Sequence, residues 1–181
     1  MLEIEQKYLV RDLVRLSETL LENGWICQQT MIQSDEYLRH PSRDFAQTDE
    51  AIRIRREDES WMVTYKGPRK GNGVKVRKEI ELPIGKTEDT GTRWLELFQS
   101  LGFSSVALVQ KHRESWRHPD KQDVVVVIDH VEAVGCYAEV ECIAQPNQEE
   151  LAKQTVTQVA ESLGLTHAVA SSYLELLLDK A

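Results

Sequence analysis

The sequence has 181 residues, of which 41% are hydrophobic and 29% are charged, and its formal net charge is −8. This length and composition predict one globular domain over residues 1–181 and exclude a disordered tail. The acidic balance argues against a nucleic-acid binder, and no apolar run approaches the roughly 20 residues that a membrane span needs. The N-terminus lacks a signal-peptide pattern, so a cytoplasmic location is expected.

The N-terminal half is predicted to consist mainly of strands. Glu3–Val10 alternates apolar and polar residues, as a strand does. Asp12 is the expected N-cap of a helix that buries Leu13, Leu16 and Leu20 and ends before Gly24. Further strands are predicted from about Cys27 to Leu38 and at Ala51–Arg56, Ser60–Lys66 and Val74–Leu82, with a glycine-rich turn at Gly67–Gly73 before the last.

The C-terminal half mixes strands with longer helices. In chain order we expect a helix at Thr87–Leu101, a strand pair with its own turn at Val106–Trp116, a buried strand at Val124–Val131, a strand at Tyr137–Ile143, a helix capped by Asn147 that extends to Leu163, and a last helix at Ser171–Asp179. About eight strands joined mostly by short turns favour an antiparallel sheet. The fold class is therefore α+β, with a sheet large enough to curl or close.

Charged side chains recur at alternate positions on at least five of these strands. Such alternation is also typical of a sheet with one solvated face. Here, however, the rows contain almost only Arg, Lys and Glu, which favours a barrel whose charges point inward and form a tunnel. The rows comprise Glu3, Glu5 and Lys7; Arg53 and Arg55; Lys66; Lys75, Arg77, Glu79 and Glu81; Lys111 and Arg113; and Glu139 and Glu141.

A tunnel with this lining restricts the chemistry. Arg53–Lys78 alone holds nine Lys or Arg against three Asp or Glu. Clustered cations repel one another by about 4 kcal/mol per pair at 4 Å and an effective dielectric of 20, so they need an anion. Polyphosphate offers enough charge and acceptor oxygens for Arg and Lys. The carboxylates would repel the phosphates unless Mg²⁺ or Mn²⁺ lay between them.

The charged motifs resemble those of the CYTH superfamily, also called triphosphate tunnel metalloenzymes. The resemblance starts with "EIEQK" (Glu3–Lys7), covers nearly the whole chain, and is closest to the class IV adenylyl cyclase branch through "HPSRDFAQTDEAIRIR" (residues 40–55). The other matching motifs, in family order, are "DEYL" (35–38), "TYKGP" (64–68), "RKEIEL" (77–82), "KHR" (111–113), "IDHVEAVGCYAEVE" (128–141) and "SYLELL" (172–177).

This resemblance implies an eight-stranded antiparallel tunnel barrel with helices outside. It also assigns roles to the charged residues. Metal ligands are expected at Glu3, Glu5, Glu139 and Glu141, and triphosphate contacts at Lys7, Arg53, Arg55, Lys66, Lys75, Arg77, Lys111 and Arg113, with Glu79 and Glu81 as further tunnel acids.

Three assignments have alternatives. Tyr37 and Lys66 form a proton-transfer dyad by analogy with a related triphosphatase branch, or Tyr37 only packs at a strand end. Asp129 is a second metal ligand, a base or an ordinary strand-end cap. The segment around Asp44, Phe45 and Asp49 is a lid, a nucleoside contact or a plain surface loop.

Three functions follow as hypotheses. The first is a class IV-like adenylyl cyclase that converts ATP to cyclic AMP and pyrophosphate with Mg²⁺ or Mn²⁺. The second is a triphosphatase that hydrolyses inorganic, thiamine or nucleoside triphosphate. The third is a non-catalytic polyphosphate-binding module. Each predicts a small-molecule triphosphate as the partner rather than nucleic acid or a membrane, and a homodimer is an assembly that the prediction leaves open.

Overall fold

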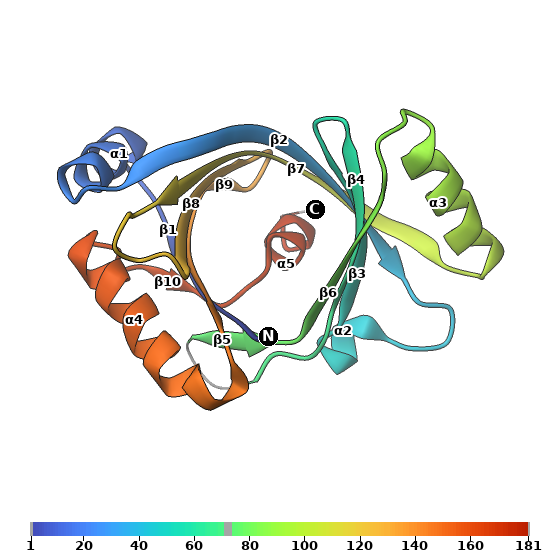
Figure 1. The fold of residues 1–181 in the computed structure, drawn as a ribbon. Coiled ribbons are helices and arrows are strands. Elements are labelled where there is room, and N and C mark those ends of the chain that lie inside the picture. The colour runs from blue at the N-terminus through green and yellow to red at the C-terminus, as the bar shows by residue number, and fades with distance from the viewer. Residues whose placement is uncertain (1, 71–73, 181) are drawn as a thin grey trace.

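The computed structural model describes residues 2–70 and 74–180, and its strands wind into one barrel (Figure 1). Within these residues there are ten strands and five α-helices. The strands are β1 (Leu2–Leu9), β2 (Ile26–Arg39), β3 (Ala51–Glu57), β4 (Ser60–Lys66), β5 (Lys75–Arg77), β6 (Glu79–Gly85), β7 (Ser104–Arg117), β8 (Val124–Val131), β9 (Gly135–Ala144) and β10 (Ala168–Val169). The helices are α1 (Leu13–Glu22), α2 (Phe45–Thr48), α3 (Thr90–Ser100), α4 (Glu149–Ser162) and α5 (Tyr173–Leu178), and a 3₁₀ turn, Pro146–Gln148, precedes α4.

Antiparallel pairing runs round almost the whole barrel. The order β1-β9-β8-β7-β2-β3-β4-β6 forms a continuous sheet, and β5 returns to pair with β1. The predicted strand Val74–Leu82 is therefore two strands, separated at Lys78, whose carbonyl accepts a hydrogen bond from the Gly67 amide at 2.9 Å. The α+β barrel prediction is confirmed, and its strand count of eight becomes ten through this break and the short β10.

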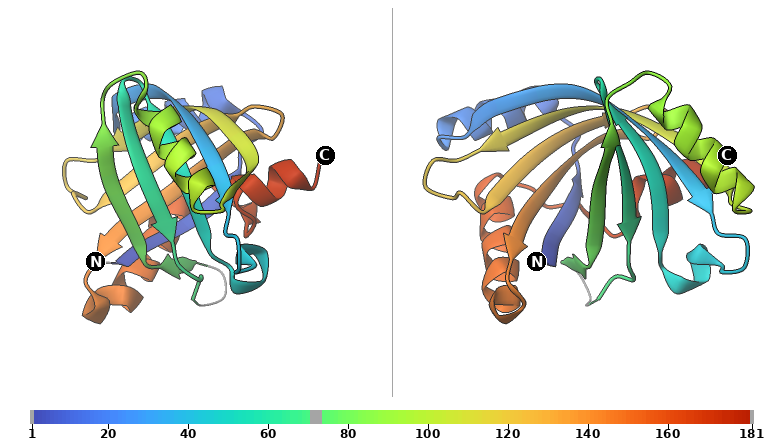
Figure 2. Two further views of the ribbon diagram at one scale, coloured as in Figure 1. Left: turned by 90° about the vertical axis from the view of Figure 1, so that its right-hand side faces the viewer. Right: turned by 45° about the vertical axis from the view of Figure 1, so that its right-hand side comes forward.

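Helices cover the outside of the barrel (Figures 1 and 2). Asp12 caps α1 by accepting a hydrogen bond from the Arg15 amide, which satisfies one of the free donors at the helix start. Helix α4 packs on β1 and β9. Its Val156 and the outward-facing Ile4 of β1 are both completely buried in the main apolar cluster. The outward-facing apolar residues of β1 thus lie under α4, and the alternate residues of the strand face the barrel interior.

Short α5 occupies a different place from the other helices. In Figure 1 it lies within the outline of the barrel, and the side view in Figure 2 places it at one end. Ser172 caps it, and Ser172 and Glu175 form a reciprocal capping box. The C-terminal segment therefore closes part of the barrel opening.

Several boundaries differ from the prediction. Val106–Trp116 is part of one long strand, β7, because it pairs along β2, which is equally long and has no turn to match. Helix α4 starts at Glu149 rather than after Asn147, since the 3₁₀ turn comes first. Helix α2 and β10 are too short to leave a periodic signal. Of the predicted turn at Gly67–Gly73, residues 71–73 lie outside the described part.

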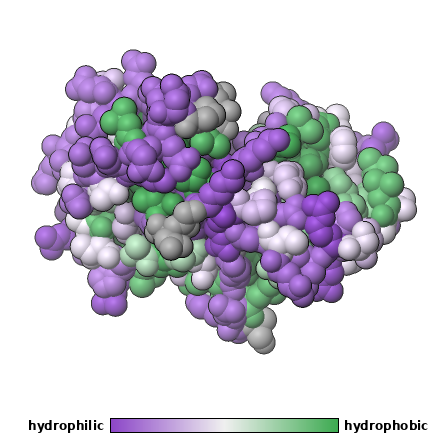
Figure 3. Space-filling view, turned by 90° about the horizontal axis from the view of Figure 1, so that it is seen from below, coloured by the Kyte–Doolittle hydropathy of each residue, from purple (hydrophilic) through white to green (hydrophobic). Residues whose placement is uncertain are grey.

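The face of the molecule seen from below in the view of Figure 1 is mostly polar. Hydrophilic side chains cover most of the face seen in Figure 3, and apolar ones reach it in smaller groups. Among the described residues, no helix combines the length and apolar character that a membrane crossing requires.

Candidate metal and phosphate site

A small cavity of about 170 Å³ lies inside the barrel and is lined almost entirely by charged side chains. The structure brings every predicted site residue to it except Asp129. Ser172 and Tyr173 complete the lining among the described residues. The predicted residues that line it are Glu3, Glu5, Lys7, Tyr37, Arg53, Arg55, Lys66, Lys75, Arg77, Glu79, Glu81, Lys111, Arg113, Glu139 and Glu141.

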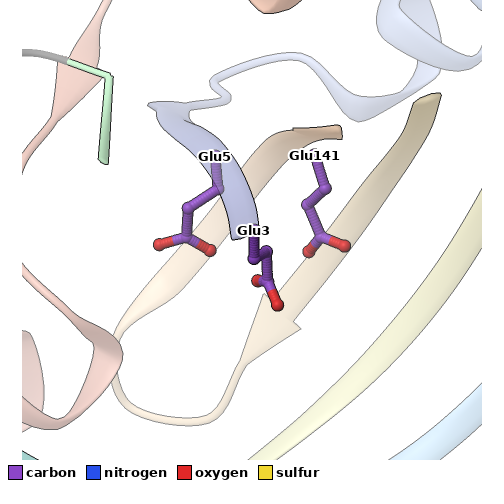
Figure 4. A group of neighbouring side chains, drawn as sticks. All are labelled: Glu3, Glu5 and Glu141. Carbon is purple, nitrogen blue, oxygen red and sulfur yellow. The ribbon is translucent and has the colours of Figure 1, made fainter. Parts of the chain in front are cut away.

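Three carboxylates gather on one wall of the cavity. Glu3 and Glu5 alternate on β1, and Glu141 of β9 pairs directly opposite Glu5. One oxygen from each of the three lies within 4.8 Å of the others, and Figure 4 shows the side chains converging. Like charges in directly opposed positions destabilise a sheet, so this arrangement is costly without a cation. Three hard oxygen donors fit Mg²⁺ or Mn²⁺.

The protonation of this wall reflects its crowding. Burial, reinforced by neighbouring carboxylates, raises the pKa of Glu3 to about 8 and that of Glu141 to about 7. Burial also opposes ionisation of Glu5, but the surrounding lysines, Lys66 first among them, hold its pKa below the usual value. A divalent cation would favour the ionised form of all three groups.

Glu139, the fourth predicted ligand, stands apart from this group. Its carboxylate pairs with Lys7 at 3.3 Å and with Arg113 at 2.7 Å. Burial opposes its charge, yet these two cations hold its pKa well below the ordinary value. In this structure Glu139 therefore balances the cationic wall rather than completing the carboxylate cluster.

On the opposite side, Asp35 organises two arginines. Its carboxylate accepts two hydrogen bonds from Arg55, at 2.6 and 2.8 Å, and one from Arg53 at 3.0 Å. Burial alone would raise the pKa of Asp35, but the two guanidinium groups lower it far below its usual range. This carboxylate fixes the arginines so that their remaining donors can face the cavity.

A second buried acid, Asp129, serves Arg113 in the same manner. It receives two hydrogen bonds from Arg113, at 2.7 and 2.6 Å, and lies 3.5 Å from the ammonium of Lys111. Asp129 is completely buried and is not among the residues that line the cavity. Burial, followed by the charge of Arg113, lowers the pKa of Lys111 to about 7.

Tyr37 and Lys66 both line the cavity, and each has a polar partner other than the proposed one. Lys66 pairs with Glu79, and the Tyr37 hydroxyl accepts a 3.5 Å hydrogen bond from Arg53. No hydrogen bond joins the proposed dyad within the part of the chain described here. Burial opposes the charge of Lys66, but nearby carboxylates, Glu79 first, raise its pKa and favour the charged form.

The remaining two cations have distinct surroundings. Lys75 pairs with Glu5 at 3.5 Å across the β5–β1 ladder. Arg77 donates hydrogen bonds to the carbonyls of Gly67, at 2.6 and 2.8 Å, and of Asp49, at 3.0 Å. Arg77 therefore holds two loops in place beside the cavity.

A second, larger cavity of about 700 Å³ adjoins the first and shares Tyr37, Lys66, Arg77 and Ser172 with it. Asp44, Phe45 and Asp49 line it, which answers where the 40–50 segment lies. The rest of its lining is mixed: Val106 and Leu174 are apolar, whereas Arg43, Arg69 and Glu175 are charged. Its size is that of a pocket for a small organic molecule.

Sequence reasoning did not identify Asp35 or Tyr173 as site residues. Asp35 does alternate with Gln33 and Tyr37 on β2, but a single acid in a strand carries no signal until its partner strand is known. Tyr173 belongs to the quoted "SYLELL" motif, yet an aromatic residue in a C-terminal helix is usually a packing residue.

Asp35→Asn should destabilise the protein by about 3–5 kcal/mol, because two buried arginines lose their counter-charge. Guanidinium unfolding at pH 7 measures this, and Glu36→Gln, next along the strand and facing outward, should change stability by less than about 0.5 kcal/mol. The low folded-state pKa of Asp35 means that its contribution is complete above the ordinary value of 3.8 and is lost as the pH falls further. The difference in unfolding free energy between Asp35→Asn and the parent should then become smaller. A difference that stays constant as the pH falls would contradict this account.

Glu3→Gln should stabilise the metal-free protein at high pH. Glu3 has a folded-state pKa of about 8 against an ordinary 4.5. The contribution of its protonated form to the stability of the parent is therefore complete below pH 4.5 and is lost as the pH rises towards 8. In EDTA at pH 9 we expect the variant to exceed the parent by about 2 kcal/mol or more, and to match it near pH 4.5. Glu88→Gln, an exposed control, should leave the pH profile unchanged. If the unfolding free energy of Glu3→Gln and that of the parent changed equally with pH, Glu3 would not be crowded as described.

Comparison with known proteins agrees with this geometry. The family model described as the CYTH domain matches residues 1–171. The chain is 34% identical over 179 residues to a protein of Methanocaldococcus jannaschii named "Putative adenylate cyclase MJ0240", covering 97% of this chain and 98% of that protein.

Solved structures show the same fold. PH1819 from Pyrococcus horikoshii OT3 aligns with a TM-score of 0.87 and 34% identity, covering 99% of both chains. HpAC1 from Hippeastrum, an adenylyl cyclase candidate described as having a dominant triphosphatase activity, aligns with a TM-score of 0.70 at 18% identity, over 98% of this chain and 95% of its own. The family model, the relative at 34% identity and the charged barrel agree, and the chain belongs to the CYTH family.

Proposed function

We propose that this protein is a metal-dependent enzyme that acts on ATP as a class IV-like adenylyl cyclase. The observation that carries the proposal is the pair of adjoining cavities. The small one offers cations and a carboxylate cluster suited to a triphosphate with its metal, and the larger one offers room for an attached nucleoside. The archaeal relative named as a putative adenylate cyclase supports the same assignment.

In this scheme Glu3, Glu5 and Glu141 would hold Mg²⁺ or Mn²⁺, which would neutralise developing charge on the phosphate and favour ionisation of the attacking hydroxyl. The 3′-hydroxyl oxygen forms a bond to the α-phosphorus while the bond from that phosphorus to the β-bridging oxygen breaks. Pyrophosphate leaves with the electron pair of that bond, and the hydroxyl proton passes to solvent.

The protein's own cations position the phosphates. Arg53 and Arg55 are fixed by Asp35, and Arg113 is fixed by Asp129, so that each presents a preorganised donor set to the cavity. Lys66 lies where both cavities meet and remains charged, which suits it to the phosphate nearest the nucleoside. Orientation and electrostatic stabilisation are the main contributions a protein makes to phosphoryl transfer.

A triphosphatase is the second candidate, since water attacking the terminal phosphorus would use the same small cavity. The larger cavity favours an organic triphosphate over inorganic triphosphate for either reaction. A module that only binds polyphosphate is disfavoured, because binding alone gains nothing from three carboxylates crowded beside the phosphates.

The products formed from ATP test the proposal. Purified protein incubated with ATP and Mg²⁺ or Mn²⁺ should release cyclic AMP and pyrophosphate in equal amounts, measured by chromatography. Parallel reactions contain tripolyphosphate or thiamine triphosphate. Orthophosphate without cyclic AMP would replace the cyclase by a triphosphatase, and no turnover of any of the three would contradict enzymatic function.

Ala46→Trp should separate the two cavities functionally. Ala46 is exposed and lines only the larger one, so an indole there would compete with a nucleoside and leave the phosphate site intact. We expect KM for ATP to rise about tenfold or more, equivalent to about 1.4 kcal/mol, with tripolyphosphate affinity unchanged.

Gln47→Trp is the matched control, because Gln47 is the exposed neighbour and is not among the residues that line either cavity. It should leave both constants unchanged. An Ala46→Trp protein that turns over ATP with the parent's KM would show that the nucleoside does not occupy this cavity.

A further inference from the structure

The C-terminal helix contributes one aromatic side chain to the phosphate cavity. Tyr173 is the first residue of α5, is 6% exposed, and lines the cavity beside Ser172. It lies just beyond residue 171, where the match to the family model ends. Figures 1 and 2 place α5 at the end of the barrel, and Tyr173 lines the cavity from this segment.

Two ammonium groups face the Tyr173 ring. The Nζ atom of Lys7 lies 3.7 Å from the ring centroid and that of Lys111 lies 5.0 Å from it. Both distances are within the range of a cation–π interaction, which strengthens where water is excluded. Lys7 and Lys111 come from β1 and β7, which β9 and β8 separate in the sheet, and both are almost completely buried.

The Tyr173 hydroxyl makes a third contact with the same wall. It donates a 2.9 Å hydrogen bond to Oδ2 of Asp129, the atom that also accepts from Arg113 at 2.6 Å. Tyr173 thereby connects both lysines with the buried pair of Arg113 and Asp129. The backbone just before α5 also holds Lys7, because the Lys7 ammonium donates a 3.1 Å hydrogen bond to the Ser171 carbonyl.

An aromatic ring differs from a carboxylate as a partner for these lysines. Glu139 also attracts Lys7, but its negative charge opposes an arriving phosphate. The ring attracts the ammonium groups through its quadrupole and adds no net charge. It can therefore hold them in place before the anion binds and leave their charge available to it. This matters most for Lys111, whose pKa burial lowers to about 7.

We propose that Tyr173 is a positioning residue of the phosphate site, which holds Lys7 and Lys111 against the cavity wall and makes the start of α5 part of the anion-binding machinery. This inference rests on the proposed function in one respect, namely that the small cavity binds the phosphates of the substrate.

Calorimetric titration of the full chain with tripolyphosphate and Mg²⁺ tests it. Tyr173→Leu removes the ring and should raise Kd about tenfold, the equivalent of about 1.4 kcal/mol. Tyr173→Phe keeps the ring and loses only the hydrogen bond to Asp129, so its Kd should stay within about threefold of the parent. A purely structural tyrosine would not produce this order, because leucine also fills an apolar site.

Leu177→Ala is the control for loosening of α5. Leu177 packs in the same apolar cluster as Tyr173 but is not among the residues that line either cavity. It should lower the melting temperature and leave Kd within about threefold. Should Tyr173→Leu fail to fold, Tyr173→Met is measured in its place and should show the same tenfold loss.

The outcomes distinguish this inference from the proposed function. A parent that binds tripolyphosphate, together with a folded Tyr173→Leu or Tyr173→Met of unchanged Kd, overturns the role of Tyr173 alone. Equal losses in Tyr173→Leu, Tyr173→Phe and Leu177→Ala overturn it too, since they indicate helix docking only. A parent that does not bind tripolyphosphate with Mg²⁺ overturns the phosphate site itself, and with it the proposed function.

Discussion

The charge balance inside the barrel is the constraint on which the rest of this structure depends. A buried ion without a partner costs several kcal/mol, so a cavity lined by this many ionised groups needs internal pairing before any ligand arrives. The protein meets this need with layers of acids. Asp35 and Asp129 lie behind the cations and neutralise them permanently, whereas Glu3, Glu5 and Glu141 face the cavity and are crowded against one another.

The acids behind the cations and the acids that face the cavity have different roles in the site. A buried acid that accepts bidentate hydrogen bonds from an arginine fixes the direction of the guanidinium, and direction is what electrostatic stabilisation of a transition state requires. A carboxylate crowded against other carboxylates is instead destabilised until a cation binds beside it, so cation binding stabilises it most. The barrel supports both by placing helices on its outer, apolar face and leaving the inner face to charged residues.

The period of the sequence accounts for much of this site. Because side chains alternate along a strand, the rows at Glu3–Lys7, Arg53–Arg55 and Glu139–Glu141 could be predicted from spacing. The pattern of elements predicted an α+β fold with a sheet large enough to close, and the resemblance to the CYTH superfamily implied the tunnel barrel. Contacts that depend on the register between strands, or on where a helix docks, could not be predicted from the sequence. Asp35 matters because it pairs opposite Arg55 across β2 and β3, and Tyr173 because a helix distant in sequence docks at the barrel end. The break at Lys78 likewise follows from pairing partners and not from composition.

That break gives the barrel a seam. Between β6, which ends the continuous sheet, and β1 the wall is completed by β5, which is only three residues long. Short strand pairings open more readily than long ones and exchange their amide protons faster. In this pairing Glu5 lies opposite Lys75 and Glu3 opposite Arg77, so two of the three acids of the proposed metal site lie on β1 and two cations lie on β5. A ligand that contacted both β1 and β5 would hold the two strands together. Closure of the barrel and binding at its site would then be coupled in one equilibrium.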